Sequence, residues 1–196
     1  MVGRIFMVHS FDPDHFQKAW AFAARWHQGQ FYLQPLETIK PFDYLYHLSG
    51  VTQETLWALD QVDHADRDLA VQCAVLHDII EDTGCGYNEI KQEFGDRVAN
   101  GVLALSKNPG LPDKSRQMDD SLARIVQQPH EIWMVKMADR ICNLLAPPHT
   151  WTKEEKAFYH QEAIKIYQIL QSANPIQAER LWQKIENYRL FIKENL

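Results

Sequence analysis

Apolar residues recur three and four positions apart along most of this chain, which is the spacing of one face of an α-helix. The first such segment follows Asp12-Pro13, a helix N-cap and the residue favoured at the first helical position, and extends to about Gln28. No segment alternates apolar and polar residues convincingly, so we expect little or no β-sheet. The pattern therefore predicts an all-α helical bundle, with further helices over residues 42–59, 66–83, 87–94, 96–105, 117–127, 131–145, 153–170 and from 175 to the C-terminus.

The breaks between these helices are short. Gly95 divides residues 87–94 from 96–105, and the segment 106–115, with two prolines and a glycine, is the clearest loop. Thr152 and Glu155 have the spacing of a capping box at the start of a helix. We see no internal repeat and no linker long enough to separate domains, so we predict a single domain over residues 1–196, with its core motifs in 16–146 and C-terminal helices in 153–196.

Composition narrows the possible functions. The chain has 196 residues, and 20 Lys+Arg against 26 Asp+Glu give a net charge of −6, which argues against a dedicated nucleic-acid-binding protein. No apolar run approaches the roughly 20 residues of a membrane span, and none has the form of a signal peptide. The three cysteines form no CxxC pair, which favours reduced thiols. We therefore expect a cytoplasmic protein with no membrane and no nucleic-acid partner.

Four hydrophilic side chains end the predicted helix 66–83, whose middle is apolar all round. They are His77, Asp78, Glu81 and Asp82. His77 and Glu81 are four residues apart, as are Asp78 and Asp82, so the two pairs form two adjacent stripes on one side of a helix. Burying several ionisable groups is costly unless something compensates their charge, and a divalent cation would do so. The other interpretation is that the helix reaches the surface here and its acids are solvated. This segment alone favours neither.

Two further segments carry polar residues in apolar surroundings. His47 lies among aromatic and aliphatic residues in 41–51, and Asp139 lies in an apolar helical stretch with Asn143 one turn later. A single histidine on such a face is more often a hydrogen-bonded core residue than a ligand, and one Asp–Asn pair is weak evidence.

Taken together, the segments resemble the motifs of HD-domain metal-dependent phosphohydrolases, whose signature is a His, then His-Asp, then a distant Asp. The resemblance is closest to the (p)ppGpp hydrolase domain of Rel/Spo enzymes and to the small alarmone hydrolases, and it implies an HD-domain helical bundle. The segments that carry it are FAARWHQGQ (22–30), PFDYLYHLSGV (41–51), AVLHDIIEDTG (74–84), EFGDRVANGVLALSK (93–107) and KMADRICNL (136–144).

This resemblance assigns roles to individual residues. It implies that the metal ligands are His47, His77, Asp78 and Asp139. A set of two imidazoles and two carboxylates suits Mn²⁺ best, with other divalent cations possible. The resemblance further implies that Glu81 and Asp82 orient the attacking water and handle its proton, and that Asn143 contacts a nucleotide substrate. A polyphosphate substrate also needs cations to offset the acids, and the substrate-binding candidates are Lys107, by resemblance, and then Lys40, with Arg140 and Lys136 near Asp139 as others. The alternative for each is an exposed surface side chain.

The implied activity is removal of the 3′-pyrophosphate from a (p)ppGpp-like alarmone. One departure from the family leaves an alternative open: the family carries basic residues after its HxGQ motif, whereas residues 31–39 here hold none and only Lys40 follows. The alternative is an HD-domain phosphohydrolase for another nucleotide, such as an adenosine alarmone or a nucleoside 5′-monophosphate. A non-enzymatic, nucleotide-sensing helical module is disfavoured because the ligands and Glu81 are all present. A homo-oligomer is also possible.

Overall fold

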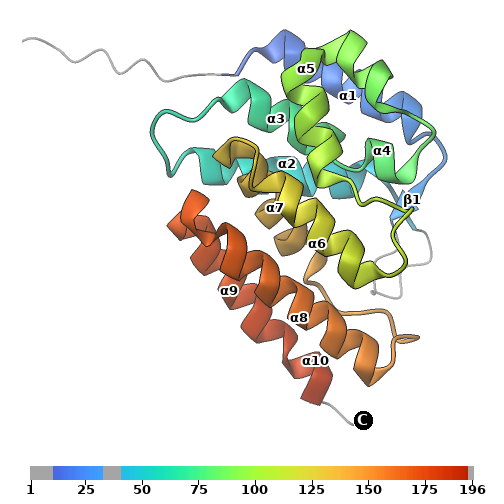
Figure 1. The fold of residues 1–196 in the computed structure, drawn as a ribbon, viewed down its shortest axis with the longest axis vertical. Coiled ribbons are helices and arrows are strands. Elements are labelled where there is room, and N and C mark those ends of the chain that lie inside the picture. Colours follow the sequence, from blue (N-terminus) through green and yellow to red (C-terminus); the bar gives the residue numbers. More distant parts are fainter. Residues whose placement is uncertain (1–10, 33–40, 194–196) are drawn as a thin grey trace, which may run out of the picture.

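The structure, a computed structural model, describes residues 11–32 and 41–193, and these residues are mostly helical (Figure 1). The local signals act as predicted: the Asp12 carboxylate accepts from the Asp14 backbone N–H, and Thr152 and Glu155 form a reciprocal capping box. The helices are α1 (Pro13–Trp26), α2 (Leu45–Leu59), α3 (Arg67–Leu76), α4 (Ile79–Asp82), α5 (Tyr87–Leu105), α6 (Lys114–Ile125), α7 (His130–Asn143), α8 (Lys153–Leu170), the 3₁₀ turn η1 (Gln171–Ala173), α9 (Pro175–Tyr188) and α10 (Leu190–Lys193).

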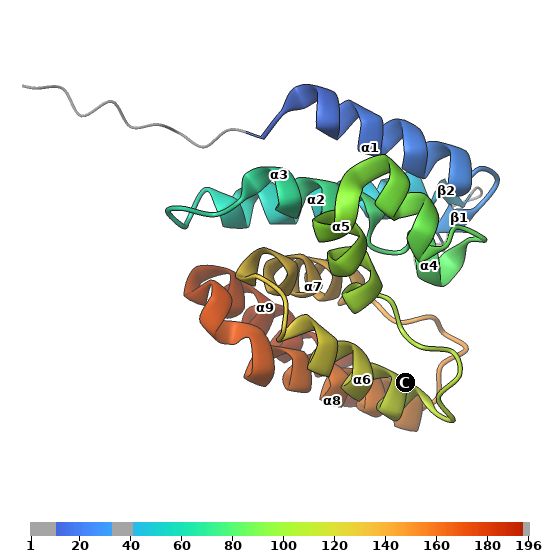
Figure 2. The ribbon, with the colours of Figure 1, turned by 45° about the horizontal axis from the view of Figure 1, so that its top comes forward.

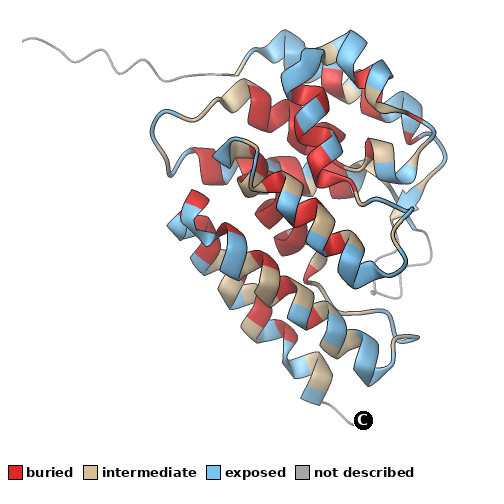
Figure 3. Ribbon diagram, in the orientation of Figure 1, coloured by how far each residue is buried: buried red, intermediate tan, exposed pale blue. Residues whose placement is uncertain are grey.

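The helices stack in layers, with α1 over α3 and α2, and α8 and α9 on the other side of α7 (Figure 2). Helix α7 packs against α2, α3, α8 and α9, which makes it the central element. All residues of α3 from Leu69 to Leu76 are buried, and α7 is buried from Met134 to Ile141, as the burial colouring of Figure 3 shows. The buried stretch of α7 includes three charged residues, Lys136, Asp139 and Arg140, so the centre of the fold is not purely apolar.

The predicted helix 66–83 is wrong as a single element. It ends at Leu76, and a new short helix, α4, begins at Ile79. The break lies at Asp78, whose φ of −96° and ψ of −4° fall in the sparsely populated region between helix and strand. Ile79 remains fully buried after the turn. The bend places His77 and Asp78 at a corner, where both side chains reach the same point.

Residues 42–59 were also expected to form one helix, but α2 begins at Leu45. Phe42–Asp43 instead forms strand β2, which pairs antiparallel with β1 (Phe31–Tyr32). The Tyr44 backbone N–H donates to the Gln30 carbonyl at 3.1 Å. This small antiparallel strand pair fixes the start of α2 beside the end of α1.

Helix α5 has the expected interruption. Gly95 has φ of +82° and ψ of +171° within an otherwise helical stretch, a conformation open to glycine and strained for other residues. The helices that the structure describes include none that is long and apolar enough to cross a membrane.

Candidate metal and acid site

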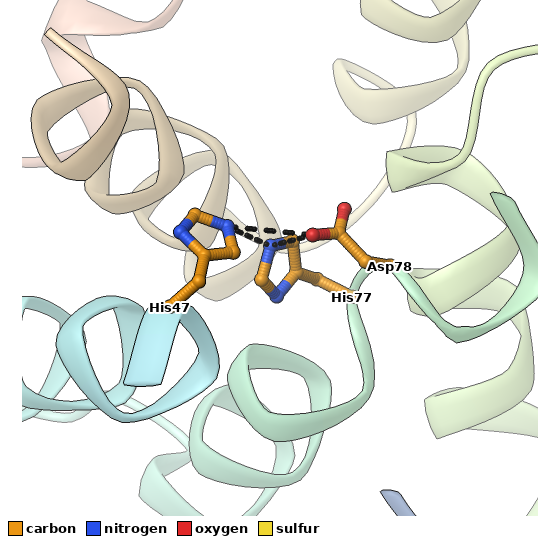
Figure 4. A group of neighbouring side chains, drawn as sticks. All are labelled: His47, His77 and Asp78. Carbon is orange, nitrogen blue, oxygen red and sulfur yellow. Dashed lines mark hydrogen bonds and ion pairs between the residues drawn. The ribbon is translucent and has the colours of Figure 1, made fainter. Parts of the chain in front are cut away.

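Two buried histidines and one aspartate meet where α2 approaches the turn between α3 and α4 (Figure 4). The Nε2 atoms of His47 and His77 are 3.3 Å apart, and Asp78 Oδ2 lies 3.3 Å from the first and 3.0 Å from the second. The Nδ1 atom of His77 lies 2.8 Å from the Ala74 carbonyl oxygen. A hydrogen bond there directs Nε2 toward Asp78, as in histidines that bind metals. These three residues could hold a divalent cation.

Asp139 of α7 reaches the same point from the opposite side. Its Oδ1 atom lies 3.6 Å from His47 Nε2 and 3.8 Å from His77 Nε2. Its Oδ2 atom accepts from Lys136 Nζ at 2.9 Å, one turn earlier on the same helix. The structure thus brings together the four residues that the sequence predicts as metal ligands, from three separate segments.

The charges at this point are strongly coupled. Burial lowers the pKa of His47, but hydrogen bonds to Asp139 and Asp78 outweigh it and raise the pKa to about 9. Burial raises the pKa of Asp78, yet neighbouring His77 and His47 hold it well below its usual range. The pKa of Asp139 is also lowered, because Lys136 and the two histidines outweigh its burial. Burial likewise lowers the pKa of His77, but the charge of Asp78 and its hydrogen bond outweigh burial and raise it. The imidazoles and the carboxylates therefore stabilise one another's charged forms.

The two predicted catalytic acids have different partners. Glu81 accepts from the Lys107 Nζ at 2.7 Å and from the Lys107 backbone N–H at 3.0 Å. Asp82 shares the Tyr44 hydroxyl with Asp78: the distances from that oxygen are 2.6 Å to Asp82 Oδ2 and 2.7 Å to Asp78 Oδ2. Burial and the charge of Asp78 raise the pKa of Asp82. Asp82 is thus linked to the metal-ligand group through the Tyr44 hydroxyl, and Glu81 is ion-paired with Lys107.

Of the three residues predicted to contact the substrate, the structure describes two, Asn143 and Lys107. Asn143 donates to Asp139 Oδ1 at 2.5 Å and accepts from the Tyr32 hydroxyl at 2.9 Å. The Tyr32 ring in turn stacks on His47, with centroids 4.9 Å apart. Lys107 is the partner of Glu81, and Lys40 lies outside the described residues.

A cavity of about 680 Å³ opens beside this group, between α6, α7 and α8. Glu81 and Asp139 lie on its walls, so the cavity adjoins the candidate metal position directly. Its other charged lining residues include Lys107, Lys114 and Arg140. A smaller cavity of about 150 Å³, lined by Tyr32, Tyr159, Tyr188 and prolines, shares Asn143 with it. Together they offer a charged compartment and an aromatic one next to the four converging side chains.

Sequence analysis missed two parts of this site. Tyr44 bridges Asp78 and Asp82, and its position three residues before His47, one helical turn away, is the signal that could have indicated it. Lys114 lies at the start of α6 in a segment predicted only as a loop. The sequence contains no local signal that this lysine would lie on the wall of the cavity.

The chain belongs to the HD-domain family. The model of that family, described as an HD domain, matches residues 19–177, which include the three ligand segments and all of α8.

Known proteins with similar sequences include "Guanosine-3′,5′-bis(diphosphate) 3′-pyrophosphohydrolase MESH1" of Danio rerio, which is 27% identical over 166 residues, 83% of this chain and 87% of that protein. The protein of the same name from Xenopus tropicalis is 28% identical over 79% of this chain and 84% of its own length. A "GTP pyrophosphokinase" of Myxococcus xanthus is 29% identical over 80% of this chain, which spans only 20% of that longer protein.

One solved structure, described as "A metazoan ortholog of SpoT hydrolyzes ppGpp and plays a role in starvation responses", matches with a TM-score of 0.76. It covers 93% of this chain and 99% of that one at 22% identity, and it confirms the all-α HD-domain fold.

Proposed function

We propose that this protein is a metal-dependent hydrolase that removes the 3′-pyrophosphate from (p)ppGpp-like alarmone nucleotides in the cytoplasm. The observation that carries the proposal is the meeting of His47, His77, Asp78 and Asp139 beside a cavity of about 680 Å³. The names of the relatives from Danio rerio and Xenopus tropicalis, which this chain matches over most of their length, support the same activity.

The donor set fits a divalent cation. The Nε2 atom of each imidazole lies 3.0–3.8 Å from a carboxylate oxygen of Asp78 and of Asp139, an arrangement that a cation stabilises because it compensates the buried carboxylates. We propose Mn²⁺, since a mixed nitrogen and oxygen set suits it. When bound, the cation supplies Lewis-acid chemistry, polarising a phosphoryl oxygen and lowering the pKa of a water molecule.

The side chains of the protein would carry out the proton transfers. Water attacks the phosphorus attached to the ribose 3′-oxygen, the bond between them breaks, and the 3′-oxygen takes up a proton. The products are pyrophosphate and a nucleoside 5′-diphosphate. Asp82, whose pKa is raised by burial and by Asp78, is suited to hold a proton and pass it on. Glu81, on the cavity wall, aims and deprotonates the water.

The experiment that tests this function is a nucleotide panel with the Mn²⁺-loaded protein. We expect pyrophosphate release from ppGpp, and none from a nucleoside 5′-monophosphate. Phosphate release from the monophosphate, or pyrophosphate release from an adenosine alarmone alone, would contradict the guanosine assignment and support the alternative substrate class.

Manganese binding should depend on pH. Below about pH 9 the imidazole of His47 carries a proton in the metal-free protein, because Asp139 and Asp78 outweigh its burial. A cation needs the neutral imidazole, so its binding must release that proton. We expect Mn²⁺ affinity to rise from pH 7 to pH 9 by roughly tenfold per unit for each proton displaced. Calorimetry in two buffers with different ionisation enthalpies measures this release, and identical heats in both would contradict it.

Tyr44 should matter for metal binding although it is not a ligand. Its ring stacks on His27 with centroids 4.8 Å apart, and Gln30 donates to the Asp82 carbonyl at 2.6 Å, so the HxGQ segment holds both the tyrosine and the acid in place. Tyr44→Phe removes only the hydroxyl that bridges Asp78 and Asp82. We expect Mn²⁺ affinity to fall about 10- to 100-fold, the usual effect of losing a hydrogen bond to a ligand.

The matched control is Tyr46→Phe. Tyr46 lies in the first turn of α2, two residues after Tyr44, but is 49% exposed, and its hydroxyl has no hydrogen bond among the described residues. The Tyr46→Phe protein should bind Mn²⁺ with the affinity of the wild type. Equal affinities for all three proteins in a calorimetric titration would rule out the positioning role of Tyr44.

A further inference from the structure

Tyr32 of β1 contacts the metal-ligand group and its surroundings at two points, although it is not one of the four candidate ligands. Its ring stacks on His47, with centroids 4.9 Å apart and 12° between the two planes. Its hydroxyl donates to Asn143 Oδ1 at 2.9 Å. The tyrosine itself is held by the strand pair, in which it lies opposite Phe42 of β2. A side chain fixed in this way can orient the residues that it touches.

The Tyr32 hydroxyl determines which end of the Asn143 amide faces Asp139. An ionised carboxylate only accepts hydrogen bonds, whereas an amide has an oxygen that accepts and an NH₂ group that donates. Asn143 therefore turns its NH₂ group toward Asp139 Oδ1, which lies 2.5 Å away. The amide oxygen then faces Tyr32, whose hydroxyl supplies the donor that this oxygen needs. The three side chains form one chain of hydrogen bonds that runs from Tyr32 to Asp139.

Asp139 Oδ1 is the oxygen that this chain of hydrogen bonds holds. It is also the oxygen that lies 3.6 Å from His47 Nε2 and 3.8 Å from His77 Nε2, whereas Oδ2 accepts from Lys136. Asn143 and Lys136 thus hold one carboxylate oxygen each. Hydrogen-bond partners of this kind orient metal ligands, and their loss weakens metal binding.

We propose that Tyr32 is a positioning residue for the cation, which acts through Asn143 to hold Asp139 Oδ1 toward the two histidines. This inference rests on the metal site of the proposed function. It gives a role to the start of the segment 31–39, which holds no basic residue. Without the hydroxyl, the Asn143 amide is free to turn and to present its oxygen to the carboxylate, which would repel it.

The test is a calorimetric titration of the metal-free protein with Mn²⁺, for the wild type and for Tyr32→Phe. The substitution removes the hydroxyl and keeps the ring that stacks on His47. We expect Mn²⁺ affinity to fall about 10-fold or more, the usual effect of losing a group that orients a ligand. An unchanged affinity would overturn the proposal.

A double-mutant cycle with Asn143→Ala distinguishes positioning from a general loss of packing. Asn143→Ala should itself weaken Mn²⁺ binding, because it removes the hydrogen bond to Asp139. In that background Tyr32→Phe should cause no further loss, since the hydroxyl acts through the missing amide. Losses that add in the double variant would refute the route through Asn143. The single variant Tyr32→Phe remains decisive even if Asn143→Ala fails to fold, because it keeps the tyrosine ring.

The matched control is Tyr87→Phe. Tyr87 is the first residue of α5 and does not line the cavity beside the metal position. Its hydroxyl also donates to an asparagine oxygen, Asn100 Oδ1, at 2.9 Å, so the control loses the same kind of hydrogen bond. The Tyr87→Phe protein should bind Mn²⁺ as tightly as the wild type. A loss equal to that of Tyr32→Phe would contradict the positioning role.

Hydrolysis is measured separately from Mn²⁺ binding, so the two proposals can fail independently. Weaker Mn²⁺ binding by Tyr32→Phe, with no hydrolysis of ppGpp by the wild type, would keep the positioning role and reject the activity. Pyrophosphate release from ppGpp, with equal Mn²⁺ affinities for the wild type and Tyr32→Phe, would do the reverse.

Discussion

Replacing Asp78 by alanine is expected to remove both the bound cation and the turnover. Its Oδ2 atom lies within 3.3 Å of both histidine Nε2 atoms and accepts from Tyr44, so it is the carboxylate most tightly built into the group. A catalytic cation contributes several kcal/mol to transition-state stabilisation, which corresponds to a loss of about 10³-fold or more in kcat/KM. Metal content by mass spectrometry and pyrophosphate release measured on the same sample would check both effects.

A matched control separates this effect from a general loss of charge. Asp63 is exposed in the turn between α2 and α3 and lies outside the cavity, so Asp63→Ala should retain metal and activity. Because Asp78 also balances buried imidazoles, circular dichroism must show that Asp78→Ala is folded. A folded Asp78→Ala protein that kept wild-type turnover would exclude the proposed site.

Glu81→Gln is expected to keep the cation and lose about 10²- to 10⁴-fold in kcat, which is the usual contribution of a general base. The amide keeps the size of the carboxylate and can still accept from the Lys107 backbone, but it cannot take a proton from water. Metal content and steady-state kinetics measure the two parts of this prediction. Unchanged kcat would remove Glu81 from the mechanism.

The ion pair between Glu81 and Lys107 offers a second explanation for a loss of activity in Glu81→Gln, because that substitution also frees the lysine from its partner. Lys107→Gln distinguishes the two roles. If Glu81 acts on water and Lys107 on a phosphate, Glu81→Gln lowers mainly kcat and Lys107→Gln raises mainly KM. If only their pairing matters, the two variants and the double variant will show equal losses, as a double-mutant cycle would reveal.

Local sequence signals predicted much of the fold. The caps at Asp12 and Thr152 and the interruption at Gly95 lie where the residues indicated, because capping and left-handed backbone depend on only a few neighbouring residues. The break between Leu76 and Ile79 could not be predicted in this way. Its apolar residues continue on both sides, and the turn is set by the packing of Ile79 and by contacts of Asp78 with distant side chains.

In the candidate site, too, local sequence indicated some features, while contacts between distant residues set the others. The residue types in three segments indicated His47, His77, Asp78 and Asp139 through the family resemblance, and the structure brings them together. The partners of those residues come from contacts between elements far apart in sequence. The bridge from Tyr44 to Asp82 spans 38 residues, and the Tyr32–Asn143 hydrogen bond spans 111. The position of Tyr44 before His47 could have indicated that residue, but no local pattern encodes its partner Asp82 or the Tyr32–Asn143 pair. The ion pair between Arg140 and Glu162 likewise forms only where α8 packs against α7.

The most direct test of the central claim is anomalous diffraction from crystals of this protein soaked in Mn²⁺. We expect one strong manganese peak enclosed by His47, His77, Asp78 and Asp139, at the edge of the cavity that Glu81 lines. No peak at that point, or a peak there with His47 or Asp139 turned away from it, would contradict the account.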